Sequence, residues 1–180
     1  MSLYGPSVEY GLHCLLWLVA EQPGRASSRD LAQMQGVPQA MLAKIMPRLE
    51  KAGIVQSQDG IAGGYELARP AHSITVLDVV DAIEGHRSIF ECKEVRRGCA
   101  LFGDTPPAWS INGVCRIHAV MLRAEKRMRA ELARTTLAEL IEGGRPAAFE
   151  ASVIEWFSEK SAGREAARLA AIRAARRPSD

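Results

Sequence analysis

Three cysteines and one histidine near the middle of the chain are the residues best suited to hold a metal ion or cluster. Cys92 and Cys99 lie in an irregular stretch of sequence, whereas Cys115 and His118 stand at the start of a long helical pattern. Residues i and i+3 share one face of a helix, so Cys115 and His118 can face the same point. Three thiolates and an imidazole can bind zinc, and they can also hold an iron–sulfur cluster in which histidine replaces a cysteine. The residue types leave both centres open.

The spacing of these residues also permits two chemistries that need no metal. Six residues separate Cys92 from Cys99, fifteen separate Cys99 from Cys115, and the sequence has no C-x-x-C pair. Two of the thiols could form a disulfide on oxidation, which would make a thiol switch. Cys115 or Cys99 could instead act as a nucleophile with a histidine as base. Because the sequence shows no phosphate-binding glycine motif or oxyanion-hole loop, we expect the protein not to be an enzyme.

The segment that contains Cys92 and Cys99, residues 86–114, has little helical or strand periodicity. Glycine and proline recur along it, and it ends in Asn112-Gly113. A connection of this length is usually functional or disordered. Cysteines at both ends favour a loop that is organised by what it binds, and we predict that residues 86–115 form a sensor loop.

The first predicted helix, Tyr4–Ala20, carries the fourth cysteine and two further polar residues. Cys14 stands among apolar residues and is expected to be a small core residue. Glu9 and His13 are four residues apart and share one edge of the helix. Taken alone, they are typical of a solvated carboxylate and a hydrogen-bonded surface histidine. The stripe expected to be buried comprises Val8, Leu12, Leu15, Leu16 and Val19.

The stretch 27–67 predicts a helix-turn-helix followed by a hairpin. Ser27 can cap the first helix, Gly36 suits its end, and Pro38 suits the start of the second. The strands Val55–Gln58 and Tyr65–Ala68 are expected to follow, joined by a glycine-rich turn. Helices, turn and hairpin in this order predict a winged helix.

The second helix of this unit, roughly residues 38–51, has two different faces. Leu42, Ile45, Met46 and Leu49 recur at the helical period on one face, and Lys44, Arg48 and Lys51 lie nearly opposite. A helix of this kind can enter a DNA major groove, although a merely solvated charged face is the plain alternative. The residues predicted to contact DNA are Arg29, Gln39, Ala40, Lys44, Arg48 and Lys51.

The remaining helical patterns follow the winged helix. A helix over 75–84 is expected to pack back on it, and a longer one covers Arg116–Ala133. The apolar seam of the longer helix is narrow and nearly heptad, which favours pairing with a second copy over packing along its own domain. Another amphipathic helix is predicted around residues 149–157, and residues 161–180 are either a marginal helix or a disordered basic tail.

Composition and charge set limits on the class of protein. The chain has 180 residues and a net charge of +2, yet residues 1–85 carry −3. DNA binding must therefore rest on a local basic patch and on two copies acting together. No apolar run reaches the roughly 20 residues that span a bilayer, and the N-terminus lacks the pattern of a signal peptide. We expect a cytoplasmic protein with no membrane contact.

Several motifs together resemble the winged-helix regulators that include the iron–sulfur regulator IscR, the nitric-oxide sensor NsrR and the redox sensor RsrR. They are LYGPSVEYGLHCLLWLV, LAKIMPRLEKAGIVQSQDGIAGGYELARP, ITVLDVVDAIEG, and the cysteine loop leading into C-x-x-H and TTLAELIEG. The resemblance implies a homodimer with paired long helices, and a loop that holds a 2Fe–2S or 4Fe–4S cluster whose state sets DNA affinity.

Carried over by position, the resemblance implies a set of cluster ligands. Cys92, Cys99 and Cys115 match the three cysteines of the family, and His118 matches its C-x-x-H histidine. Glu9 and His13 match an acid and a histidine that, in some branches, bind the cluster of the partner subunit. The VEYGLHC string resembles the redox-sensing branch, in which two of the cysteines can suffice.

The combined prediction is a mainly α protein, a winged helix-turn-helix domain with a small β wing and a long dimerisation helix. We expect a DNA-binding transcriptional repressor that forms a homodimer, binds a double-stranded operator and is controlled by an iron–sulfur cluster, with 2Fe–2S favoured over 4Fe–4S. A zinc-bound or thiol-switch regulator is the alternative. The expected units are residues 1–85 (DNA-binding domain), 86–115 (sensor loop), 116–142 (dimerisation helix and short capping helix) and 143–180 (C-terminal helix and basic tail).

Overall fold

The computed structural model describes residues 3–19, 24–60 and 63–175 and is mainly helical, as expected. Its one described sheet pairs two antiparallel strands. The elements are α1 (Pro6–Leu15), α2 (Ser28–Gln35), α3 (Gln39–Lys51), β1 (Val55–Gln58), β2 (Gly64–Leu67), η1 (Ala71–Ser73), α4 (Val76–Glu84), η2 (Val95–Gly98), η3 (Ala100–Phe102), α5 (Ala108–Ile111), α6 (Arg116–Leu132), η4 (Glu139–Ile141) and α7 (Ala147–Ala175).

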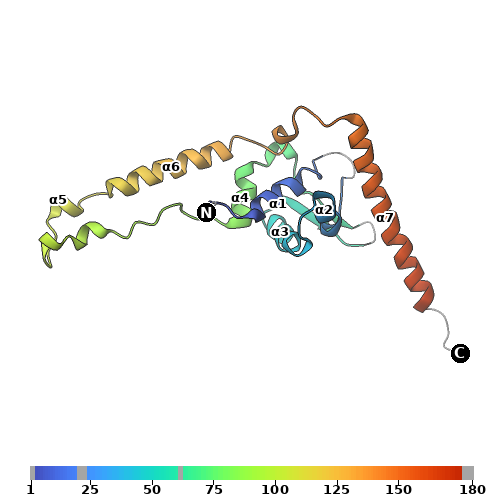
Figure 1. The fold of residues 1–180 in the computed structure, drawn as a ribbon, viewed down its shortest axis with the longest axis horizontal. Coiled ribbons are helices and arrows are strands. Elements are labelled where there is room, and N and C mark those ends of the chain that lie inside the picture. The colour runs from blue at the N-terminus through green and yellow to red at the C-terminus, as the bar shows by residue number, and fades with distance from the viewer. Residues whose placement is uncertain (1–2, 20–23, 61–62, 176–180) are drawn as a thin grey trace.

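Helices α1 to α4 and the two strands form a winged-helix body around one core (Figure 1). Leu31 of α2, Leu42 and Leu49 of α3, and Val79 of α4 are fully buried in it. These are the apolar positions that recur at the helical period in the sequence. The fold class predicted from the sequence is confirmed.

Local capping fixes where these helices begin and end. The Ser27 hydroxyl accepts a hydrogen bond from the Asp30 N–H (3.1 Å), and Gly36 ends α2 with φ at 71°. Thr75 and Asp78 form a full capping box at the start of α4. Each motif satisfies backbone groups that a helix end leaves unpaired. Both helices therefore start at the residues that the sequence predicted.

Two sequence expectations need correction in α1. The helix spans Pro6–Leu15 rather than Tyr4–Ala20, and it ends early because the amides of Trp17 and Leu18 bond three residues back, as Leu18 N–H does to the Leu15 carbonyl (2.9 Å); Ala20 itself lies outside the described residues. The buried side is also rotated from the expected stripe. It comprises Val8, Gly11, Cys14, Leu15 and Leu18. A Cβ at Gly11 would lie 2.5 Å from Ile83 Cδ1, so this glycine permits the close approach of α4.

The wing is a short hairpin that is also tied to α2. Strand β2 begins at Gly64, one residue earlier than predicted, and pairs with β1 in the register Val55↔Leu67 to Gln58↔Gly64. Tyr65 in addition forms an isolated bridge with Ala26, just before α2. The wing is therefore fixed at its base to the entrance of the helix-turn-helix.

Replacing Gly64 with alanine is expected to destabilise this junction by about 2 kcal/mol. Gly64 has φ at +154°, and a Cβ there would lie 2.6 Å from the Ala26 carbonyl carbon and 2.9 Å from the Ser27 nitrogen. Urea unfolding of the variant measures the loss. Gly98→Ala is the matched control, because a Cβ at Gly98 meets nothing within 4 Å; equal stability of the two variants would contradict the expectation.

Helix α6 and the loop before it project from the body as a long arm (Figure 1). Its base is held by Arg129, whose guanidinium makes two hydrogen bonds to the Asp81 carboxylate of α4 (2.8 and 2.7 Å). The buried Glu125 carboxylate accepts hydrogen bonds from the Ser88 hydroxyl (2.9 Å) and the Ile89 N–H (3.3 Å). The Arg129–Asp81 contact joins α6 to the body, and the Glu125 contacts join α6 to the first residues of the loop.

Residues 147–175 form one continuous helix. The described part of residues 161–180 is therefore helical, which was one of the two alternatives that the sequence left open. Its first half packs on the body through the buried residues Val153 and Phe157. The short capping helix expected within residues 116–142 is a single 3-10 turn, in which the Glu139 carboxylate accepts a hydrogen bond from the Thr136 N–H (2.6 Å).

Candidate functional site

The Cys92 thiol lies close enough to Cys115 to interact with it at the tip of the arm, where α6 begins. Cys115 is the residue that precedes the first turn of α6. The backbone N–H of His118, with that of Ile117, the Arg96 guanidinium and the Cys92 thiol, lowers the pKa of Cys115 from its ordinary value, against partial desolvation. A thiolate at a helix N-terminus is also favoured by the helix dipole. The sequence placed both cysteines in one site, and the structure brings them together.

Cys99 lies on the rim of a hollow that also includes Cys115. Phe102 and Trp109, whose rings meet edge to face with centroids 5.7 Å apart, form its apolar side. Cys99 is exposed, and all three cysteines of the tip are free thiols. Across residues 3–19, 24–60 and 63–175, the single chain gathers no three His, Cys, Asp or Glu side chains closely enough for a metal ion. The tip thus holds two adjacent thiols with a third nearby.

Arg96 also belongs to this site, although the sequence pattern did not predict it. Its guanidinium pairs with the Glu94 carboxylate (Nη2–Oε2 2.9 Å) and donates a hydrogen bond to the Gly113 carbonyl (3.1 Å). The charges of Cys115 and Cys92 contribute to the raised pKa of Arg96, after the larger effect of Glu94. Arg96 therefore ties the loop together beside two sulfur atoms. The signal available in the sequence was an arginine pair between two cysteines.

His118 and Cys14 have contrasting surroundings. The His118 ring is half-buried against Phe90, with ring centroids 5.9 Å apart, one turn from Cys115. Cys14 is fully buried in the body, and burial raises the pKa of its thiol to about 12. Its expected place in the core is confirmed.

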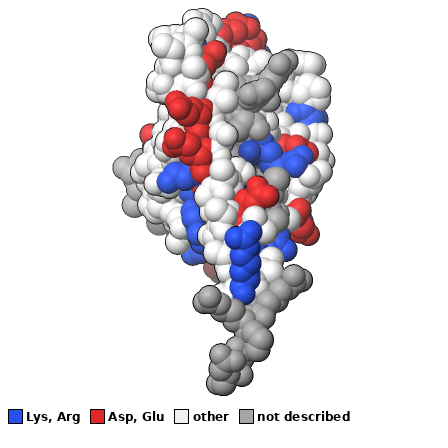
Figure 2. Space-filling model, turned by 90° about the vertical axis from the view of Figure 1, so that its right-hand side faces the viewer, with Lys and Arg blue, Asp and Glu red and all other residues white. Residues whose placement is uncertain are grey.

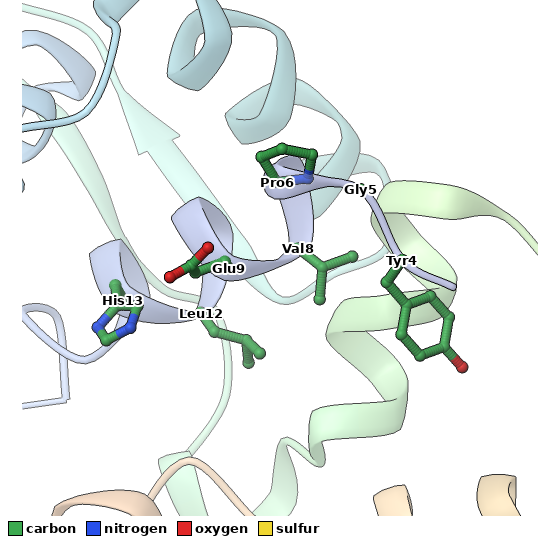
Figure 3. Close-up of a pocket in the computed structure, with 7 residues that line it drawn as sticks. All are labelled: Tyr4, Gly5, Pro6, Val8, Glu9, Leu12 and His13. Atoms are coloured by element: carbon green, nitrogen blue, oxygen red, sulfur yellow. The ribbon is translucent and has the colours of Figure 1, made fainter. Parts of the chain in front are cut away.

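Glu9 and His13 lie on the body rather than on the arm. They are exposed on consecutive turns of α1 at one end of a surface depression, and Tyr4 stands at the other end (Figure 3). The start of α6, which Cys115 directly precedes, is at the far end of the arm from α1 (Figure 1). A single chain therefore does not bring Glu9 or His13 to the cysteines.

Thiol accessibility is expected to separate Cys14 from the other cysteines. In folded, metal-free protein, a disulfide reagent such as Ellman's is expected to modify Cys92, Cys99 and Cys115, because these are half-buried or exposed, whereas Cys14 reacts only after unfolding. Counting released thiolate before and after adding denaturant measures this. Reaction of all four thiols at the native rate would contradict the placement of Cys14.

The predicted DNA contacts are all on the surface of the helix-turn-helix. Gln39 and Ala40 are exposed at the start of α3, Lys44 is exposed one turn later, and Lys51 is exposed at its end. Arg29 is exposed in the first turn of α2. Lys44 and Lys51 join none of the ion pairs found among the described residues. A cationic side of α3 is therefore available to a ligand, and the contacts themselves stay predictions.

Arg48 has a protein partner that the helix pattern did not predict. Its Nη1 donates a hydrogen bond to the Ile83 carbonyl near the C-terminal end of α4 (2.6 Å). Two residues earlier in α4, Asp81 pairs with Arg129 of α6 (Nη2–Oδ2 2.7 Å). Helix α4 therefore contacts both α3 and the base of the arm. Lys44 becomes a stronger candidate than Arg48 for a DNA contact.

A helix-turn-helix with an exposed cationic second helix and a two-stranded wing defines a winged-helix DNA-binding protein. The chain belongs to the Rrf2 family, described as iron-dependent transcriptional regulators, which matches residues 5–143. Protein rrf2 of Nitratidesulfovibrio vulgaris is 36% identical over 135 residues, which cover 73% of this chain and 82% of that protein. A putative HTH-type transcriptional regulator of Aquifex aeolicus is 25% identical over 139 residues, 77% of this chain and 91% of that one.

Solved structures share the fold. CymR of B. subtilis, a global cysteine regulator, is 23% identical with a TM-score of 0.60, over 78% of this chain and 96% of that one. IscR of T. potens is 22% identical with a TM-score of 0.57, over 79% and 88%. The family consists of transcriptional regulators, so the expectations of a regulator and of a non-enzyme are confirmed. Among the described residues no helix has the length and apolarity to cross a membrane.

Proposed function

We propose that this Rrf2-family regulator is a dimeric repressor whose operator affinity is controlled by an iron–sulfur cluster, 2Fe–2S in preference to 4Fe–4S, held at the tip of the arm. The observation that carries the proposal is the adjacent pair Cys92 and Cys115, with Cys99 on the same hollow. Thiolates are the ordinary protein ligands of such clusters. The amides that lower the pKa of Cys115 favour the ligating form of its sulfur.

A second copy of the chain is the proposed source of the remaining ligand, with His118 as the alternative within the same chain. The single chain leaves large apolar side chains exposed on α6, among them Ile117 at 66% and Val120 at 53% exposure. Pairing of two α6 helices would cover them. It would also allow the arm of one subunit to reach the depression that contains Glu9 and His13 on the other.

Helix α4 supplies a physical route from the arm to the DNA-binding helix. A ligand changes an equilibrium only by binding two conformations unequally, so the tip must differ between its two states. When bound, a cluster supplies a centre that gains or loses an electron. Movement of α6 would be passed to α4 through the Arg129–Asp81 pair, and from α4 to α3 through the Arg48 contact with Ile83. The two recognition helices of a dimer would then change their spacing.

Anaerobic purification tests the proposed centre. We expect coloured protein with visible absorption bands and with iron and acid-labile sulfide in about equal amounts, as a 2Fe–2S or 4Fe–4S cluster requires. Colourless protein free of iron and sulfide would refute the cluster. Stoichiometric zinc in the same preparation would support the zinc-bound regulator instead.

A thiol switch is the second candidate, because the adjacency of Cys92 and Cys115 favours it directly. With hydrogen peroxide as the oxidant, the two thiols would lose two electrons and two protons to form a disulfide, and the peroxide would become two molecules of water. Mass measurement of metal-free protein after peroxide treatment, with and without a reductant, tests this. A Cys92–Cys115 disulfide that changes operator affinity in protein without iron would favour the switch over the cluster.

A further inference from the structure

Helix α7 lies outside the part of the chain that matches the family, which ends at residue 143, yet it is firmly attached to the body. Val153 and Phe157 of its first half are buried in the core. Just before it, the Arg145 guanidinium stacks 4.2 Å from the centre of the Trp17 ring, and the Phe149 ring lies 6.3 Å from the same ring. The first half of α7 is thus docked on the body beside the end of α1.

One ion pair fixes α7 beside the start of the helix-turn-helix. The Arg164 guanidinium pairs with the Asp30 carboxylate in the first turn of α2. The Asp30 side chain is only 5% exposed. A buried carboxylate without its cationic partner would be costly, so the pair holds this point of α7 against α2.

Beyond Arg164 the helix leaves the body. Every residue from 165 to 175 is exposed, and the charged residues after Glu165 within the described helix are Arg168 and Arg173. The sequence continues with two further arginines at positions 176 and 177. Neither Arg168 nor Arg173 forms an ion pair with any described residue. This end of the helix is therefore cationic and without a carboxylate partner in the described part of the chain.

The position of Arg168 relates it to the DNA-binding surface. It follows Arg164 by four residues and so lies on the same side of α7, one turn further along. Figure 1 shows α7 passing α2 and ending away from the body, with α3 on the far side of α2. Figure 2 shows Lys and Arg side chains toward this end of the α7 face, with Asp and Glu mainly nearer the other end. In helix-turn-helix proteins the first helix of the motif crosses the DNA backbone, and here α2 carries both Asp30 and the exposed Arg29.

We propose that the exposed cationic end of α7, residues 165–175, is an additional binding surface for duplex DNA, with Arg168 and Arg173 contacting backbone phosphates that flank the sequence read by α3. The inference rests on the proposed operator binding by the helix-turn-helix. Each subunit of a two-fold symmetric dimer places one such helix at an outer edge of the operator. The interaction carries no base information and lengthens the stretch of DNA that the protein needs.

The same segment also exposes Leu169 (44%) and Ile172 (39%), which a second copy of the chain could cover. Two apolar side chains among alanines make a small interface, whereas Arg168 and Arg173, which outnumber Glu165 on this segment and form no ion pair with any described residue, complement a phosphate backbone. DNA is therefore the favoured occupant, and pairing between copies is an outcome that the experiment detects.

The test compares two duplexes from the protein's own promoter region. One is limited to the base pairs that α3 is proposed to contact, and the other also includes the natural flanking sequence. Wild-type protein is expected to bind the longer duplex about tenfold more tightly at physiological salt. Arg168→Gln/Arg173→Gln should bind both duplexes equally, and its salt slope on the long duplex should fall by roughly 0.9 for each phosphate that the variant no longer neutralises. Arg87→Gln/Arg134→Gln, which removes the same charge at two side chains 80% and 79% exposed, is the control and should behave as wild type.

Three outcomes would overturn the inference. If wild type and variant both bind the two duplexes equally, the proposed flanking interaction is refuted, whereas operator binding still stands. An unchanged DNA affinity with an altered sedimentation mass in the Arg168→Gln/Arg173→Gln protein would assign the helix end to pairing between copies. If the wild type shows no salt-sensitive binding to either duplex, both the proposed operator binding and this inference are refuted. Circular dichroism of the variant confirms that α7 remains helical.

Discussion

Replacing Cys115 with alanine is expected to lower the iron content of the anaerobically purified protein by a factor of about ten or more. A metal site commonly loses roughly 10- to 100-fold in affinity when a residue that only supports its ligands is changed, so removal of a proposed ligand should cost at least as much. Cys115 is the thiol that adjoins both Cys92 and the hollow of Cys99. Iron and sulfide assays on variant and wild type, prepared in parallel, give the comparison.

Cys14→Ala is the matched control for this result. It also removes one thiol, but from the core of the body, where the sulfur is fully buried in α1. That variant should keep its iron even if it unfolds at a lower denaturant concentration. Iron retained by Cys115→Ala, or depleted equally from both variants, would show that the arm tip does not hold the centre.

Lys44→Ala is expected to weaken binding of the dimer to its operator by about tenfold or more, since the substitution removes an interaction worth roughly 1–3 kcal/mol from each subunit. Lys44 is exposed in the first half of α3 and opposite the buried Leu42 side. Titration of a labelled promoter duplex at several salt concentrations measures the effect. Removal of a phosphate contact would reduce the salt slope by about 1, whereas removal of a base contact would relax sequence preference.

Arg87→Ala serves as the control, because Arg87 is a cation 80% exposed that lies after α4 rather than on the helix-turn-helix. It should bind the operator as wild type does. Equal affinity of the Lys44→Ala protein and wild type at every salt concentration would mean that α3 does not read this DNA.

Features fixed by neighbouring residues could be predicted from the sequence. The Ser27 cap, the left-handed Gly36 and the Thr75–Asp78 capping box depend on groups within a few residues of one another. Burial of Leu42 and Leu49 follows from the period of a single helix. These signals were sufficient to establish the winged helix and its order along the chain.

Contacts between distant parts of the chain could not be predicted in this way. The partner of Arg48 is a backbone carbonyl of α4, and the partner of Arg164 lies in α2. Neither pairing leaves a pattern in the sequence, because the angle at which helices cross decides it. The helix beyond residue 160 was ambiguous for a related reason. An Ala/Arg-rich segment has few large apolar residues whose spacing could indicate which face packs against the body.

The cysteines of the candidate site could be predicted from the sequence, but the arrangement of all its predicted ligands could not. Sequence grouped Cys92, Cys99 and Cys115, and the chain places all three at one end of the arm. Glu9 and His13 remain on α1, remote from that end, so their proposed role depends on a second subunit. The geometry of a site shared between two copies depends on the contacts between those copies, and such contacts are absent from a single chain.

Control of DNA binding by the cluster is tested most directly by the operator affinity of one anaerobic preparation measured twice, with the cluster in place and after its removal by a chelator, at equal dimer concentration and salt. We expect affinities that differ by about tenfold or more, in line with a coupling free energy of roughly 1–3 kcal/mol. The same affinity in both states, from protein shown to be folded and dimeric, would contradict control of DNA binding by the arm tip.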